Sequence, residues 1–103
     1  MAIATFVVKA TIELEHEDAF NDWNNNEHAP QLLQYNGAVS ARRYKRIMGD
    51  EKWQYVAVYE FSSQEVFEAF MESDHLETLR DEYNKNFGDT SARVGLGYVQ
   101  VWP

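Results

Sequence analysis

The sequence predicts an α+β fold in which helices cover one face of a four-stranded antiparallel sheet. Four segments show the period-two alternation of apolar residues that is typical of strands. Two further segments carry apolar residues at helical spacing. These segments follow one another in the order β-α-β-β-α-β, and a chain of 103 residues is long enough for one domain of this kind. We therefore expect residues 1–103 to form a single domain.

The first half of the chain contains one strand and one interrupted helix. A strand is expected within residues 3–13, where alternate positions are apolar. The acidic residues 15–18 favour a helix start, because negative charge is stabilised at the positive end of the helix dipole. We expect the helix over about residues 18–29, with a kink or restart at Pro30. A short turn over residues 31–35 then precedes Asn36-Gly37, a strong stop signal.

The second half predicts a hairpin, a broken helix and a final strand. Strands over residues 38–48 and 53–61 are joined by a turn at Gly49-Asp50. Ser62-Ser63 and Ser73-Asp74 are each expected to cap a helical piece, and the second piece ends at about residue 86. The last strand covers residues 92–102, where Gly95 and Gly97 suggest a bulge or a close sheet–sheet contact. This order of elements is that of the ferredoxin-like split βαβ arrangement.

Composition excludes several classes of function. The formal net charge of −8 disfavours nucleic acid, because an acidic surface repels phosphate backbones. Cysteine is absent, so disulfides, thiol nucleophiles and cysteine-ligated metals are excluded. The N-terminus does not resemble a signal peptide, and no segment approaches the ~20 apolar residues of a membrane span. We expect a protein of the cytoplasm that binds neither nucleic acid nor membranes.

Both faces of the predicted sheet are apolar. One side of the third strand carries Trp53, Tyr55, Tyr59 and Phe61, while its other side still carries Val56 and Val58. Helices cover only one face of such a sheet, so the second face needs a cover of its own. We predict a homodimer in which two sheets pack face to face, since two-fold homodimers are the commonest assembly. The alternative is a monomer with an aromatic ligand-binding face.

Polar side chains occupy the predicted buried face of the first helix. Counted from Trp23, the residues Asn24 and Glu27 lie on or beside this face, and His28 lies at its edge. A buried polar group costs roughly 1–3 kcal/mol without a partner, so these residues indicate an internal network or a ligand cavity. A carboxylate beside an imidazole would fix its tautomer and raise its basicity. For His28 the alternative is a helix-end histidine bonded to a carbonyl.

Other candidates lie on the strands and on the second helix. Tyr55 and Tyr59 share one strand face, and their hydroxyls can donate to a developing enolate oxygen; the alternative is a role in the core or dimer interface. Tyr44 is a similar candidate on the second strand. Arg43 faces the opposite way from Arg42 in the strand's alternation and is a candidate for holding a carboxylate or enolate. His75 is a candidate general base at a helix break, or an exposed helix-start residue.

Metal and nucleotide motifs are missing from the sequence. The three histidines, His16, His28 and His75, are far apart, and neither HExxH nor an EF-hand pattern occurs. No glycine-rich phosphate loop or GxSxG motif is present. We therefore expect neither a metal nor a cofactor.

A family resemblance adds to this interpretation. The segment from Phe20 to Pro30, with its Trp and its Glu-His pair shortly before a proline, and the Gly37-led strand that ends in Arg43-Tyr44 resemble the EthD-like branch of the dimeric α/β-barrel superfamily. The strand over residues 55–61 and the Ser73-Asp74-His75 segment also fit. The resemblance implies a ferredoxin-like protomer, dimerised sheet on sheet, with a pocket between each sheet and its own helices.

The same resemblance implies several activities. The superfamily includes isomerases, polyketide cyclases, a lyase, cofactor-free quinol-type monooxygenases and haem-degrading enzymes, many of which need only a His and a Tyr. A plant cyclase has its catalytic His in a segment similar to that of His75. Haem-degrading members would have a histidine one turn later, near Arg80 in this chain, so haem binding is not expected.

The leading hypothesis is a cofactor-independent enzyme that isomerises, cyclises or cleaves a small oxygenated, partly hydrophobic substrate by proton transfer. His28 is the expected acid/base, oriented by Glu27 or Asn24. The residues expected to polarise the substrate oxygen are His75, Tyr44, Tyr55 and Tyr59, and those expected to contact the substrate also include Trp23 and Arg43. The alternatives are a small-molecule binding dimer without turnover and a cofactor-free monooxygenase.

Overall fold

The computed structural model describes residues 2–103 and confirms the predicted order of elements. The strands are β1 (Ala4–Ala10), β2 (Ala38–Lys45), β3 (Tyr55–Phe61) and β4 (Arg93–Val99). The helical elements are η1 (Leu14–His16), α1 (Glu17–Trp23), η2 (Asn24–His28), α2 (Ala29–Leu33), α3 (Gln64–Met71) and α4 (Asp74–Phe87).

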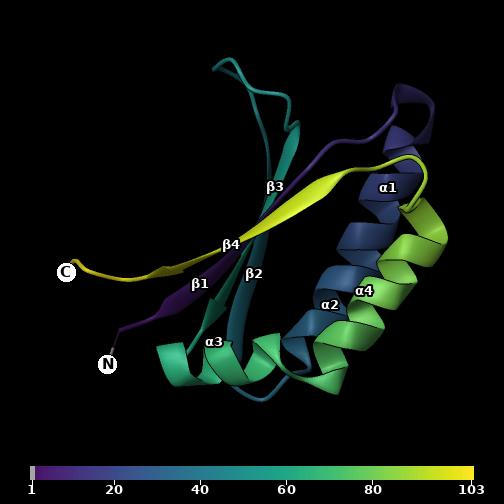
Figure 1. Cartoon of the computed structure of the whole chain (residues 1–103). Coiled ribbons are helices and arrows are strands. Elements are labelled where there is room, and N and C mark those ends of the chain that lie inside the picture. Colours follow the sequence, from purple (N-terminus) through teal and green to yellow (C-terminus); the bar gives the residue numbers. More distant parts are fainter. Residues whose placement is uncertain (1) are drawn as a thin grey trace.

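The four strands form one antiparallel sheet in the order β2-β3-β1-β4. The helices lie together on one side of this sheet (Figure 1). Phe6 of β1 pairs with Tyr59 of β3, and both side chains are buried against the helical layer. The structure is therefore an α+β fold with the ferredoxin-like topology. Helices described within residues 2–103 are too short or too polar to cross a membrane.

Both predicted serine caps form. The Ser63 hydroxyl accepts a hydrogen bond from the backbone N–H of Val66, 3.1 Å away, at the start of α3. The Ser73 hydroxyl accepts one from Leu76 at the same distance and starts α4. Each bond satisfies a backbone donor that a helix leaves unpaired in its first turn. The broken second helix is thus fixed by two local sequence signals.

Of the expected kink or restart at Pro30, the structure shows a restart: the α-helical segment α2 begins at Ala29. The chain stays helical from Glu17 to Leu33, and a π-helical turn, η2, stands before the proline. The Ala29 N–H bonds the Asn24 carbonyl, five residues back. Because Pro30 has no N–H to donate and its ring crowds the carbonyl four residues earlier, a wider turn accommodates it without breaking the helix.

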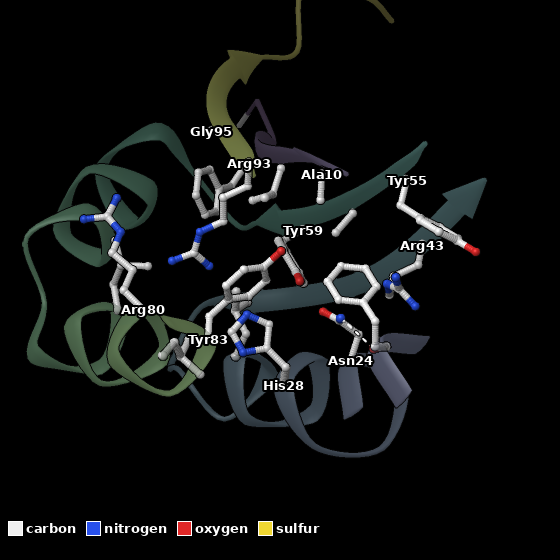
Figure 2. A pocket seen from close by; sticks show the side chains of 17 residues that line it. Ala10, Asn24, His28, Arg43, Tyr55, Tyr59, Arg80, Tyr83, Arg93 and Gly95 are labelled. Carbon is white, nitrogen blue, oxygen red and sulfur yellow. Dashed lines mark hydrogen bonds between the residues drawn. The ribbon is translucent and has the colours of Figure 1, made fainter. Parts of the chain in front are cut away.

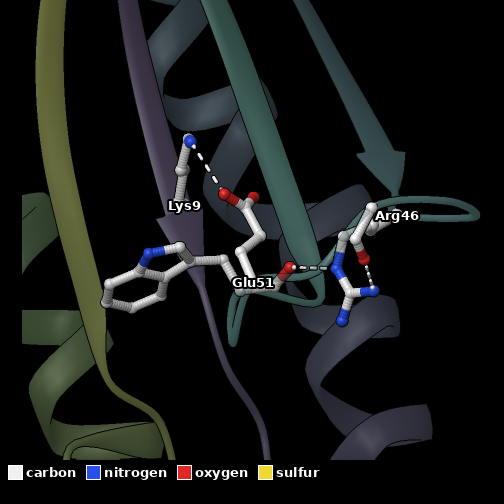
Figure 3. A network of polar contacts seen from close by, with 5 residues as sticks. Lys9, Arg46 and Glu51 are labelled. Atoms are coloured by element: carbon white, nitrogen blue, oxygen red, sulfur yellow. Dashed lines mark hydrogen bonds and ion pairs between the residues drawn. The ribbon is translucent and has the colours of Figure 1, made fainter.

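Two strands are shorter than expected. The second strand ends at Lys45 and the third begins at Tyr55, although the backbone N–H of Arg46 still donates to the Gln54 carbonyl at 2.8 Å. Its guanidinium donates to the carbonyls of Trp53 and Gly49, at 3.2 and 2.8 Å. Lys9 of β1 also reaches the loop, with its Nζ 3.4 Å from Glu51 (Figure 3).

The last strand ends at Val99, before the expected residue 102. Val99 pairs with Ala4, where β1 begins, so residues beyond it have little neighbouring strand left to bond. The expected bulge at the glycines does not form either, since the β1–β4 register is regular. A Cβ on Gly95 would lie 2.9 Å from the Phe6 ring, and one on Gly97 would lie 2.6 Å from the Phe67 ring. The glycines make room for rings under the sheet.

The sheet face opposite the helices is largely apolar, as predicted. Strand register places Val7 beside Val58 on one side and beside Leu96 on the other. Tyr98 and Tyr44 lie on the same face and are 55 % and 53 % exposed. The apolar side chains of this outer face are Val7, Val56, Val58, Val94, Leu96, Tyr98 and Tyr44.

Candidate functional site

A cavity of about 180 Å³ lies between the inner face of the sheet and the helices. It is lined by Phe6, Val8, Ala10, Phe20, Asn24, His28, Leu32, Arg43, Tyr55, Ala57, Tyr59, Leu76, Leu79, Arg80, Tyr83, Arg93 and Gly95 (Figure 2). A dry cavity of about 150 Å³ is large enough to bind benzene. This one therefore has room for a ring-sized ligand.

His28 projects from the π-turn into the cavity and is only 8 % exposed. Its Nδ1 is buried without a hydrogen-bond partner. Within residues 2–103 no side chain or backbone group bonds either ring nitrogen, so nothing in this part of the chain fixes the tautomer. Nε2 is not enclosed in the same way and is the nitrogen left to meet a ligand. Figure 2 shows the ring below Tyr83 and beside Asn24.

The surroundings of His28 favour its neutral form. Burial and, to a smaller extent, the positive charges of Arg93 and Arg43 together lower its pKa from 6.5 to about 4. The imidazole is therefore uncharged at neutral pH and can accept a proton. The prediction that the Glu27 carboxylate raises the basicity of His28 is wrong, because Glu27 is exposed and does not line the cavity.

The π-turn explains the positions of Asn24, Glu27 and His28. Such a turn holds one residue more than an α-turn, so His28 falls below Asn24 on the buried face and Glu27 turns toward solvent. Asn24 is 4 % exposed and lines the cavity, but its Nδ2 donates to the Phe20 carbonyl at 2.8 Å. It therefore does not orient His28 through a hydrogen bond.

Two of the predicted tyrosines line the cavity, but only one of them has a hydroxyl without a hydrogen-bond partner among the described residues. Tyr59 is 2 % exposed, and burial raises its pKa to about 12, so its phenol stays protonated. Its hydroxyl bonds no group within residues 2–103 and can donate to a ligand oxygen. The Tyr55 hydroxyl is already occupied, since it accepts from Asn21 at 3.0 Å and donates to Glu17 at 2.5 Å.

Three arginines line the cavity, and one of them was predicted. Arg43 donates to Asn25 at 2.8 Å and lies over the Phe20 and Tyr55 rings. Arg93 lies with its guanidinium carbon 3.7 Å from the centroid of the Tyr83 ring. Burial lowers the pKa of both guanidinium groups, although both remain charged at neutral pH. Arg80 approaches the same cavity from α4.

Sequence reasoning missed Arg93, Arg80 and Tyr83. A signal for Arg93 was present, because it has the same strand parity as Gly95 and Gly97, whose missing side chains leave room under the sheet. The register pairs Arg93 with Ala10, a buried residue of the inner face. Tyr83 is a buried residue of α4 that also lines the cavity, and its hydroxyl bonds Ser91 Oγ at 2.5 Å.

Besides Glu27, three predicted site residues do not line the cavity. Tyr44 pairs with Val56 on the outer face of the sheet, because it alternates with Arg43. His75 lies between the helices, where its Nε2 donates to the Gln31 carbonyl at 2.7 Å. Trp23 stacks on His28 with ring centroids 4.5 Å apart, behind the cavity wall. The structure therefore does not bring these side chains to a ligand held in the cavity.

One group of side chains has the spacing of a metal site. Within the part of the chain that the structure describes, only Glu13, Glu15 and His16 bring potential ligand atoms within 4.8 Å of one another. All three are exposed and lie outside the cavity. The cavity itself offers arginine, tyrosine and amide groups, which suit an oxygen-bearing organic ligand better than a cation.

Comparison with solved structures supports the fold. An EthD family protein from Bacillus halodurans is similar with a TM-score of 0.66 and 17 % identity, over 93 % of this chain and 97 % of that one. A putative antibiotic biosynthesis monooxygenase from Nitrosomonas europaea has a TM-score of 0.70 and 19 % identity, over 98 % and 92 %. SnoaB, a cofactor-independent oxygenase from Streptomyces nogalater, has a TM-score of 0.60 and 18 % identity, over 98 % and 95 %.

At these identities the likeness shows the fold, and it confirms the predicted resemblance to EthD-like proteins at that level. No curated protein sequence matches this chain. Residues 3–95 match a family described as "Domain of unknown function (DUF4286)". That match spans the first three strands, all of the helices and the cavity-lining part of β4. The chain therefore belongs to the DUF4286 family.

Proposed function

We propose that this protein is an enzyme that isomerises a small oxygenated substrate by proton transfer, using its own side chains without a metal or cofactor. The observation that carries the proposal is the uncharged, unpartnered imidazole of His28 in a cavity with arginines and a free phenol. A buried polar group without a partner costs stability. A role of the unpartnered His28 imidazole in acting on a bound ligand would explain why it is kept at the cavity wall.

The proposed step is a proton shift through an enolate. His28 Nε2 accepts a proton from a carbon beside a carbonyl, and the C–H electron pair forms a carbon–carbon double bond while the carbonyl pair moves to oxygen. The Tyr59 hydroxyl donates to that oxygen, as donors in oxyanion sites do. The imidazolium then returns the proton to another atom of the same substrate. Electrons and protons balance, and no co-reactant is consumed.

The arginines make a base of low pKa useful. A base works best when its pKa is near the operating pH, and the pKa of His28 is about 4 because of burial and the charges of Arg93 and Arg43. The negative charge of an enolate near those guanidinium groups offsets their effect on the pKa of the imidazole. The basicity of His28 therefore rises as negative charge develops on the substrate, which favours the transition state over the free enzyme.

Solvent hydrogen exchange tests this proposal. Phenylpyruvate, 2-oxocyclohexanecarboxylate and 1-indanone each carry an enolisable carbon and about one ring. In D₂O the wild type should speed deuterium incorporation into at least one of them, and His28→Gln should lose about 100-fold or more of that rate. His75→Gln, whose imidazole faces the α2 backbone, is the control and should keep it. Equal rates for the wild type and His28→Gln with every compound would contradict the proposal and leave a binding role.

A second candidate is cofactor-free oxygenation. The similar fold of a cofactor-independent oxygenase favours it, and it would begin with the same deprotonation. The enolate or phenolate would then donate electrons to O₂, and one oxygen atom would enter the product while the other leaves as water. Oxygen consumption with an anthrone or quinol separates the candidates, because proton-shift isomerisation consumes no O₂.

We also propose that two copies pair through their outer sheet faces. Central positions Val7 and Val58 are apolar and adjacent there, and an exposed apolar face of a sheet is stabilised when a second sheet covers it. Light scattering should give a mass of twice 12.0 kDa. Val58→Glu should shift the protein to the monomer, whereas Thr78→Glu, on an exposed position of α4, should not. A wild-type mass of one chain in dilute solution would contradict the pairing.

A further inference from the structure

The charge around the cavity contrasts with the charge of the whole chain. The molecule has a formal net charge of −8, yet the lining residues include Arg43, Arg80 and Arg93 and no aspartate or glutamate. Like charges that share a cavity repel one another, and Arg80 is one of the charges that lower the pKa of Arg93. Such an arrangement is stabilised when an anion enters.

Arg93 is the arginine best placed to meet that anion. Within residues 2–103 it forms no ion pair, whereas Lys9, Arg42 and Lys45 are each paired with a glutamate. The Arg93 guanidinium also forms no hydrogen bond to any group within residues 2–103, and the Tyr83 ring packs against one of its faces. Arg43, in contrast, already donates to Asn25. Figure 2 shows the Arg93 guanidinium beside the Tyr83 ring.

The remaining wall limits the rest of the ligand. Aromatic and aliphatic side chains enclose the space beyond the guanidinium groups, among them Phe6, Phe20 and Leu76. The cavity of about 180 Å³ is close to the size that accepts one aromatic ring. An apolar body of about one ring therefore fits beside a single charged group.

We propose that the substrate of this site is a ring-sized organic acid whose carboxylate is bound by Arg93. This inference rests on the proposed function, because it names the substrate class of the same cavity. Arg43 and Arg80 add positive potential without being the primary contact. The carboxylate and the guanidinium form a charge-assisted pair in a largely desolvated space, where such pairs are strongest.

Binding of matched acids and amides tests the inference without any turnover. The probes are benzoate, 3-phenylpropanoate and hexanoate, each beside its amide, titrated into the full chain at pH 7 and followed by NMR chemical shifts of the cavity residues. We expect at least one acid to bind roughly 10- to 100-fold more tightly than its amide. Similar affinities for every acid and its amide, or no binding of any acid at 10 mM, would overturn the inference.

Substitutions locate the charge that is responsible. Arg93→Gln should reduce the preference for the acid to below about 3-fold, and Arg93→Lys should keep part of it, because lysine retains the charge without the planar fork. Arg42→Gln, on the outer face beside Glu60, is the matched control and should keep the full preference. A preference that survives in a folded Arg93→Gln protein, as judged by its NMR spectrum, would overturn the assignment to Arg93.

The two proposals fail in different ways. Acid preference that depends on Arg93, together with equal exchange rates in the wild type and His28→Gln, would remove the enzymatic proposal and leave an acid-binding protein. The other outcome is exchange that depends on His28 and occurs equally well with the neutral 1-indanone, without any preference for acids over amides. That result would support the enzymatic proposal and overturn the proposal that the substrate is an organic acid.

Discussion

The Trp23 indole stacks on the His28 imidazole, with ring centroids 4.5 Å apart and planes 23° from parallel. Tyr83 meets the same imidazole edge-on at 5.8 Å. His28 is thus held by aromatic rings rather than by a hydrogen-bond partner. This support keeps the imidazole at the cavity wall and leaves its nitrogens free, which is what a group that exchanges protons with a ligand requires.

The stack leads to a prediction about Trp23. Trp23→Leu removes the ring that shields one face of the imidazole, so water gains access and the pKa of His28 should move up from about 4 toward 6.5. NMR titration of the imidazole carbons measures this directly. Trp53→Leu is the control, because Trp53 lies at the β2–β3 loop and does not line the cavity. An unchanged pKa in Trp23→Leu would show that the stack does not control the desolvation.

The pKa of His28 also predicts how stability depends on pH. The unfolded chain takes up the proton near 6.5, but the folded protein does so only near 4. Between these values the unfolded state binds more protons, so the free energy of unfolding falls as the pH drops through this range. The full contribution is about 3 kcal/mol.

Urea unfolding of the wild type and His28→Gln checks that contribution. Between pH 7.5 and pH 4.5 the wild type should lose about 2–3 kcal/mol more than the variant, since glutamine does not titrate. The carboxylates titrate in both proteins, so they cancel in the comparison. Parallel losses in the two proteins would mean that His28 titrates near its ordinary pKa in the folded state.

Packing under β4 gives a prediction about Gly97. A Cβ at this position would lie 2.6 Å from the tip of the Phe67 ring, so Gly97→Ala should destabilise the protein by about 1–2 kcal/mol. In a Phe67→Leu background the shorter side chain makes room, and the same change should cost less than about 0.5 kcal/mol. Thermal or urea unfolding of the four proteins measures the coupling. Equal costs in both backgrounds would show that the ring does not set the requirement for glycine.

Local signals made most of the fold predictable. Ser63 and Ser73 cap the two pieces of the second helix, and the alternation of Tyr55, Ala57, Tyr59 and Phe61 gives the buried face of β3. These features depend on nearest neighbours in the chain. Strand ends were less predictable, because they depend on where the neighbouring strand begins, as for Val99 opposite Ala4.

The site was predicted only in part. His28 and Tyr59 were found because a polar or phenolic side chain on a buried face is informative in itself. The π-turn was not expected, and it decides that His28 faces the cavity while Glu27 does not. Its warning signs are three consecutive asparagines followed by Pro30, a combination of weak helix formers and a missing donor. Placing Arg93 in the site required the pairing of β4 with β1, which brings together residues far apart in the sequence.

A crystal structure of the protein with phenylpyruvate would show whether His28 and Arg93 act on the same bound ligand. We expect the ligand under the π-turn, with its carboxylate within hydrogen-bond distance of Arg93 and its enolisable carbon about 3–3.5 Å from His28 Nε2. A ligand bound elsewhere on the molecule, or a His28 ring turned away from it to bond the protein, would overturn the proposed role of His28.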